Sequence, residues 1–186
     1  MHKKYFTDAI IVVAAILTGA TAIAAGITFS GPSQEEIKSI TLAEAVRIDR
    51  IAWARENGCK NPEATVKAVE HSPLADLLIS QAIQESNCNP EAIGRAGEIG
   101  GWQVIESDWG TVPKGDLAGQ ADQAEKILTT WLKARDARGD FTVALARYNG
   151  GETPPSQSFK YANQILERQQ QLTQYILEKT EERAGG

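Results

Sequence analysis

The chain is predicted to be mainly α-helical, and the spacing of its apolar residues supports this prediction. Apolar residues recur every three to four positions over 34–58, 122–138 and 156–183, as on the buried face of a helix. The stretch 72–88 is apolar around most of its circumference, which is typical of a helix inside a core. Glycines and alternating residues over 94–104 predict a loop with a small β-hairpin.

Length and composition indicate one globular domain with additional segments. The 186 residues are 42% hydrophobic and 23% charged, which is enough to build a buried core. The formal net charge of −5 argues against nucleic acid as the main partner, because that partner requires a basic face. Because the chain is negative overall, it would have to bind an anionic polymer through local contacts.

Residues 1–33 are predicted to be a signal anchor or a signal peptide. Lys3 and Lys4 precede an uncharged run over 9–29, which is about 31 Å long as a helix and can span a bilayer. The lysines favour a cytoplasmic amino terminus, so the domain would lie outside. The alternative is cleavage at small residues within 20–24. Both interpretations export the domain.

Helices are predicted over 34–58 and 62–71 and are expected to pack on the rest of the domain, with Cys59 between them and Cys88 after them. Because an exported protein with an even pair of cysteines favours a disulfide, we expect Cys59 to pair with Cys88. The bond would close about thirty residues and stabilise the fold by about 3 kcal/mol. The alternative is two free thiols. His2 and His71 give the cysteines no metal-ligand spacing, so neither a metal nor a cofactor is expected.

Glu85 is the candidate catalytic residue. Ser72 and Pro73 suit the start of a helix, and Asn89-Pro90 suits its end, which places Glu85 in the last turn. Desolvation and the negative end of the helix dipole would both raise the pKa of this carboxyl group. An acid that keeps its proton near neutral pH is what cleavage of a glycosidic bond needs. The alternative is a solvated glutamate at a helix end.

Short motifs follow Glu85 in a fixed order. They are Glu85-Ser86, Asn89-Pro90, the loop from Gly97 through Gly100 to Gln103, Tyr148-Asn149 and Tyr161. In this order and spacing, residues 72–167 resemble the catalytic domain of the soluble lytic transglycosylase family. These bacterial and phage enzymes have a goose-type lysozyme fold and cut the glycan strands of peptidoglycan. Residues 168–186 would then be a helical extension.

The resemblance implies a role for each matched residue. Glu85 would be the acid, and the substrate-binding residues would be Ser86, Trp102, Gln103, Tyr148, Asn149 and Tyr161. Trp102 has two interpretations, a platform for a sugar ring or a core residue, whereas Trp109 and Trp131 are expected in the core. The chain departs from the family pattern at Cys88, Glu98, Gly101, Trp102 and Arg147, so a differently shaped cleft floor is expected.

The implied reaction cleaves the β-1,4 bond between muramoyl and glucosaminyl sugars and leaves a 1,6-anhydromuramoyl end. The alternative is a hydrolysing muramidase, in which Glu98 would be the second carboxylate. A third interpretation is a non-catalytic glycan-binding component of a secretion system or virion.

The expected partners follow from these interpretations. They are peptidoglycan strands, the membrane through residues 9–29, and proteins of secretion, conjugation or phage assembly. The expected location is the cell envelope, either anchored in the inner membrane with the domain in the periplasm, or free in the periplasm after cleavage of the signal.

Overall fold

The computed structural model describes residues 33–135 and 137–185. By its internal contacts the chain divides into two units, Met1–Leu42 and Ala43–Gly186. The described part of the first unit is Ser33 and the beginning of α2 (Gln34–Glu56). The membrane or signal segment predicted over 9–29 lies outside the described residues. Within the described ranges, no helix is long and apolar enough to cross a bilayer.

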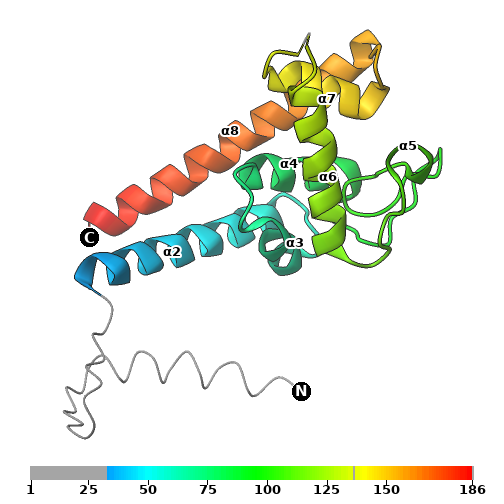
Figure 1. Cartoon of the computed structure of the whole chain (residues 1–186). Coiled ribbons are helices and arrows are strands. Elements are labelled where there is room, and N and C mark those ends of the chain that lie inside the picture. Colours follow the sequence, from blue (N-terminus) through cyan, green and yellow to red (C-terminus); the bar gives the residue numbers. More distant parts are fainter. Residues whose placement is uncertain (1–32, 136, 186) are drawn as a thin grey trace, which may run out of the picture. The chain divides into compact units, whose positions relative to one another are not determined.

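The predicted helical class is confirmed for the described chain (Figure 1). After α2, the helices are α3 (Pro62–Val69), α4 (Ala75–Ser86), α5 (Glu106–Trp109), α6 (Leu117–Leu132), α7 (Phe141–Gly150) and α8 (Ser156–Gly185). The stretch predicted as one or two helices over 34–58 forms one. The four-residue helix α5 was not predicted, because it lacks a periodic apolar pattern.

The predicted hairpin over 94–104 is reduced to isolated bridges. Ile99 forms antiparallel bridges with Ile93 and with Val104, and the described residues contain no longer ladder at this place. Gly97 and Gly100 both adopt a positive φ, which interrupts the extended backbone that a strand requires. This segment is therefore a compact loop.

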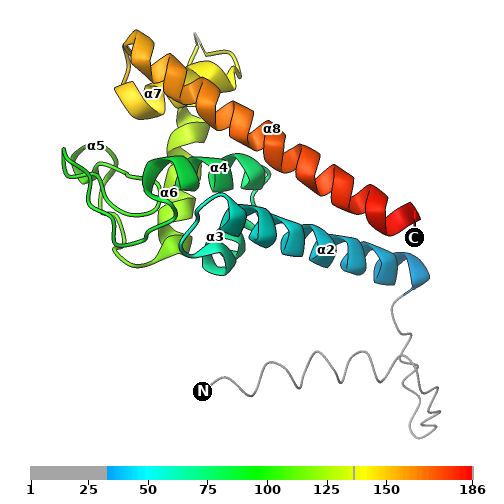
Figure 2. The same ribbon diagram turned by 180° about the vertical axis from the view of Figure 1, so that it is seen from behind.

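Helix α4 lies at the centre of the second unit and contacts α3, α6 and α8 (Figures 1 and 2). Every residue from Leu77 to Ile83 is buried. Leu78 and Ile79 belong to one apolar cluster, and Leu77 belongs to a second one that includes α7 and α8. The core therefore fixes the position of this helix from all sides.

The ends of α4 differ slightly from the prediction. The helix begins after Ser72, whose hydroxyl accepts a hydrogen bond from the Leu74 N–H at 3.0 Å. It ends before Asn89-Pro90, because Asn87 takes the left-handed conformation and the Cys88 N–H turns back to donate to a helix carbonyl. Glu85 still lies in the last turn, as predicted.

Aspartates cap the next two long helices. Asp116 accepts a hydrogen bond from the Ala118 N–H at 3.0 Å, so α6 begins earlier than the predicted stretch 122–138 and also ends earlier. Asp140 accepts from the Thr142 N–H at 2.7 Å, which confirms its predicted role as the cap of α7. Together these caps set where α6 and α7 approach the end of α4.

Helix α8 continues without a break through residues 168–185. Its first half packs on α4 and α7, where Ile165 is fully buried. Near its carboxyl end, Arg183 donates to Asp49 of α2 at 2.7 Å, and Asp49 is only 3% exposed. The ion pair ties the end of α8 to the second unit's part of α2.

Candidate active site

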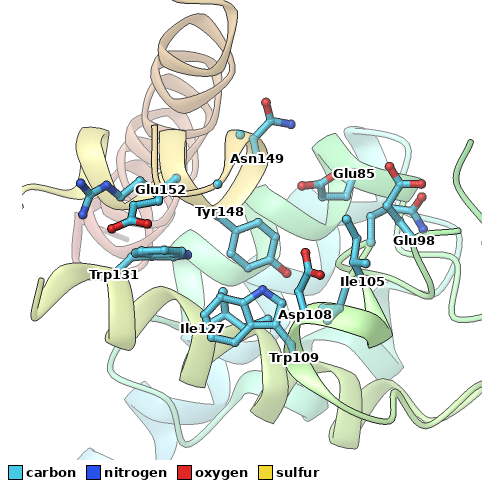
Figure 3. A pocket seen from close by; sticks show the side chains of 15 residues that line it. Glu85, Glu98, Ile105, Asp108, Trp109, Ile127, Trp131, Tyr148, Asn149 and Glu152 are labelled. Atoms are coloured by element: carbon cyan, nitrogen blue, oxygen red, sulfur yellow. The ribbon is translucent and has the colours of Figure 1, made fainter. Parts of the chain in front are cut away.

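The end of α4 borders a pocket of about 610 Å³ (Figure 3). Four parts of the second unit form its wall: the last turn of α4, residues 98–109, one face of α6, and the end of α7 with the loop after it. The lining residues are Glu85, Glu98, Gln103, Val104, Ile105, Asp108, Trp109, Ile127, Trp131, Arg147, Tyr148, Asn149, Gly150, Gly151 and Glu152.

Glu85 is half-buried in the wall of this pocket, and its Oε1 accepts a hydrogen bond from the Tyr161 hydroxyl. Burial raises the pKa of Glu85 from 4.5 to about 7. The bond from Tyr161 opposes this rise in pKa, and the negative charge of Glu98 adds to it. The protonated form of Glu85 is therefore populated near neutral pH.

Two tyrosines lie beside Glu85, as the motifs predicted. Tyr161 bonds to the carboxylate directly, and the Tyr148 hydroxyl donates to the carbonyl oxygen of Trp102 at 2.9 Å. Burial and then the charge of Glu85 raise the pKa of both tyrosines well above their usual range. Both hydroxyls therefore stay neutral and keep their protons at any pH near neutrality.

Gln81 is a residue of this site that the sequence interpretation did not assign. Its Nε2 donates to the Tyr161 hydroxyl oxygen at 3.4 Å, which favours directing the hydroxyl hydrogen toward Glu85. Gln81 is fully buried. The sequence did contain a signal for this role. Gln81 is a polar residue on an apolar helix face four positions before Glu85, and residues four positions apart lie on the same face of a helix.

The site loop, residues 89–105, faces the end of α4, and the buried side chain of Gln120 binds its backbone. Gln120 Oε1 accepts from the Gly101 N–H at 2.7 Å, and its Nε2 donates to the Pro113 carbonyl at 2.8 Å. A Cβ atom on Gly100 would lie 2.3 Å from the Gln120 side chain, and φ is +80° at this glycine. Only glycine fits there.

Trp102 is a core residue and not a sugar platform. Its side chain is fully buried, and its indole N–H donates to the Leu78 carbonyl oxygen at 2.9 Å. A ring enclosed in this way has no face open to a ligand. The prediction of Trp102 as a substrate-binding residue is therefore wrong for this structure, and the alternative of a core residue is confirmed.

The other predicted binding residues divide into two groups. Gln103 and Asn149 line the pocket, where Gln103 Nε2 donates to the Gly100 carbonyl and Asn149 Oδ1 accepts from the Ser158 hydroxyl. Ser86 is absent from the lining. Its hydroxyl donates to the Gly101 carbonyl at 2.8 Å, so it fastens the site loop to α4.

Trp109 and Trp131 line the pocket, although the sequence favoured a core position for both. Their ring centroids are 5.8 Å apart in an edge-to-face arrangement. The guanidinium of Arg147 lies over the Trp131 ring, 5.4 Å from its centroid. Both rings also contact the core. Each ring therefore packs partly in the core, as expected, and also borders the pocket.

The predicted disulfide between Cys59 and Cys88 is present, with 5.1 Å between the Cα atoms. It joins Cys59, which lies shortly after the end of α2, to Cys88, which follows the left-handed residue Asn87 at the end of α4. The Asn61 amide adds a hydrogen bond to the Cys88 carbonyl at 2.9 Å. These links hold the end of the helix that carries Glu85.

Among the described residues, no group of three or more histidine, cysteine, aspartate or glutamate side chains lies close enough to hold a metal ion. The chemistry that the pocket itself offers is proton transfer by Glu85 and hydrogen bonding by the neutral tyrosines and the amides of Gln103 and Asn149.

No protein-family model matches the chain, and neither a curated protein nor a solved structure matches it.

Proposed function

We propose that this chain is a lytic transglycosylase with a goose-type lysozyme-like fold that cleaves peptidoglycan glycan strands. The observation that supports this most is Glu85, whose pKa of about 7 suits a general acid and which borders a pocket large enough for sugars. The order and spacing of Glu85-Ser86, the glycine loop, Tyr148-Asn149 and Tyr161 give the second support. The domain would act outside the cytoplasmic membrane.

In the proposed reaction, Glu85 first donates its proton to the oxygen that links the muramoyl and glucosaminyl sugars. The bond from this oxygen to the muramoyl anomeric carbon breaks. The Glu85 carboxylate then accepts the proton of the muramoyl 6-hydroxyl, whose oxygen forms a bond to the same anomeric carbon. Glu85 recovers its proton, no water is consumed, and the product is a 1,6-anhydromuramoyl end.

The hydrogen bonds around Glu85 suit this proton transfer. Tyr161 donates to Oε1, which leaves Oε2 as the oxygen that holds the proton in the acid form. The same hydrogen bond stabilises the carboxylate that exists between the two proton transfers, since it favours the charged form. Gln81 is a positioning residue that orients the hydroxyl of Tyr161.

The second candidate function is a hydrolysing muramidase, because Glu98 lines the same pocket. Its negative charge raises the pKa of Glu85, so the two carboxylates interact. In this reaction Glu98 would activate a water molecule. However, Glu98 Oε2 already accepts a hydrogen bond from the Ala96 N–H at 2.8 Å, which favours a role in holding its own loop.

Mass spectrometry of the fragments released from purified peptidoglycan distinguishes these functions. The full chain should release fragments with anhydromuramoyl ends, Glu85→Gln should release none, and Glu98→Gln should keep the same product. Fragments with reducing ends, which are about 18 Da heavier, would instead indicate hydrolysis and a role for Glu98. No release by the full chain would contradict both enzymes and favour a glycan-binding role.

A further inference from the structure

We propose that Trp109 and Trp131 form a second sugar subsite in the pocket, separate from the site of bond cleavage. The ligand would be a neutral pyranose ring of the same glycan strand. This inference rests on the proposed function for the identity of the strand. In Figure 3, Tyr148 lies between Trp131 and Glu85, so a sugar on the tryptophans would be a neighbour of the sugars that react.

The two rings differ from the other tryptophans of the chain. Trp53 and Trp102 are 4% and 0% exposed, whereas Trp109 and Trp131 are only partly buried and border the pocket. Aromatic rings that bind a ligand need an open face and an apolar support behind them. Trp109 borders the pocket and packs against the core, whereas Arg147 lies over the ring of Trp131.

Packing limits the motion of the rings. The edge-to-face pair has 5.8 Å between centroids, and Arg147 lies 5.4 Å from the centroid of Trp131. Because Arg147 is over Trp131, this ring mainly orients the pair. Trp109 lies on α5, a helix with no buried residue, so its ring can contribute most of the contact. A rigid platform loses little conformational entropy on binding.

Polar groups of the pocket complete the subsite. Glu152 is exposed and lies beside Trp131, Asp108 precedes Trp109 in the pocket wall, and Asn149 lines the same pocket beyond Tyr148 (Figure 3). An apolar wall with a few amide and carboxylate groups suits a sugar, which presents C–H faces and hydroxyl edges. The same carboxylates disfavour an anionic group at this end of the pocket.

The subsite predicts that cleavage depends on strand length. A glycan that reaches from Glu85 to Trp109 should have a lower KM than a shorter glycan that covers only the cleaved bond. Trp109→Ala should raise KM about tenfold for long glycans, the size expected for one aromatic contact, and leave short glycans unchanged. Trp131→Phe keeps an aromatic ring and should have a smaller effect.

Binding can be measured without cleavage. In the full chain with Glu85→Gln, oligomers of N-acetylglucosamine from two to six sugars are titrated while the heat of binding is recorded. The longer oligomers should bind more tightly, and this gain should be lost when Trp109→Ala is added. Trp53→Phe is the matched control, because Trp53 lies in the core outside this pocket, and it should keep the gain. An unchanged response in the Trp109→Ala protein would overturn the subsite.

The two measurements separate the subsite from the proposed function. Length-dependent binding that requires Trp109, without any release of anhydromuramoyl ends, would support the subsite and contradict the transglycosylase. Release of anhydromuramoyl ends with the same length dependence in wild type and Trp109→Ala would support the enzyme and overturn the subsite. Thermal unfolding of each variant shows whether a lost response comes from a lost fold, and Trp131→Phe then provides the second test.

Discussion

Helix α4 and the site loop of residues 89–105 face each other across the entrance to the same site, but different forces hold them. The helix is buried from Leu77 to Ile83 among apolar side chains on all sides. The loop places three apolar residues, Ile99, Trp102 and Val104, in the core, and its backbone also depends on hydrogen bonds with the side chains of Gln120 and Ser86. The acid therefore has a position set by apolar packing, whereas the opposite wall combines apolar packing with a few specific polar contacts.

This difference indicates how each region can be changed. Many small apolar contacts together stabilise the position of α4 in the core. No single polar group therefore decides where Glu85 lies. The polar contacts of the loop, in contrast, depend largely on one fully buried amide, that of Gln120. Because an unsatisfied buried polar group costs about 1–3 kcal/mol, a single substitution should release the loop.

The largest expected effect is that of Gln120→Ala. The side chain bonds to the Gly101 N–H and to the Pro90 and Pro113 carbonyls, so its loss leaves several buried backbone groups without partners. We expect the free energy of unfolding in urea to fall by about 4 kcal/mol. The control is Gln123→Ala, which should lose less than about 1 kcal/mol because its bonds to the Trp109 and Gly110 carbonyls are more exposed. Equal losses in the two variants would contradict the role given to Gln120.

The second effect tests the fastening of α4. Replacing Cys59 and Cys88 together by serine removes the disulfide that closes a 29-residue separation. Stability should fall by about 3 kcal/mol in urea unfolding. Wild type unfolded with a reducing agent should match the double variant, and an oxidised wild type no more stable than the variant would show that the bond contributes nothing.

The third prediction is a substitution, Glu85→Gln, that increases the free energy of unfolding. The folded-state pKa of Glu85 is raised from 4.5 to about 7, so ionisation of this group opposes folding as pH rises through that range. The penalty is absent below about pH 4 and complete above about pH 7 to 8. Glu85→Gln should therefore increase the free energy of unfolding by about 2–3 kcal/mol at pH 8 and change it little at pH 4. A variant that is less stable than wild type at pH 8 would contradict the raised pKa.

The smallest effects are shifts of the pH profile of cleavage. The rate should fall as pH rises through about 7, because Glu85 must hold a proton. Tyr161→Phe removes a bond that lowers the pKa of Glu85, so the fall should move to higher pH. Glu98→Gln removes a charge that raises this pKa, so the fall should move to lower pH. Shifts in the same direction would show that the hydrogen bond and the charge have been assigned incorrectly.

The sequence predicts the helix better than the loop for a physical reason. The position of Glu85 follows from local patterns, namely apolar spacing along 72–88 and the polar residues at its ends. Asp140 was likewise recognisable as a cap because capping involves residues two or three positions away. Each of these interactions joins residues that lie only a few positions apart in the sequence.

The contacts of the site loop join residues far apart in the chain. Gln120 holds residues 19 and 30 positions away, and no local pattern distinguishes it from a surface glutamine. Local sequence patterns are equally unable to distinguish the tryptophans. Trp102 and Trp109 are close in the sequence, yet one packs against α4 in the core and the other borders the pocket, since tertiary packing decides which ring is covered.

The most direct test of the account is the pKa of Glu85 itself. Carbon-13 NMR of the full chain labelled at glutamate carboxyl groups follows each carboxyl through a pH titration, and Glu85→Gln identifies the signal by its disappearance. We predict that this signal titrates at about pH 7. Titration near 4.5, the ordinary value for glutamate, would show that Glu85 is ionised at neutral pH and would contradict its role as the acid.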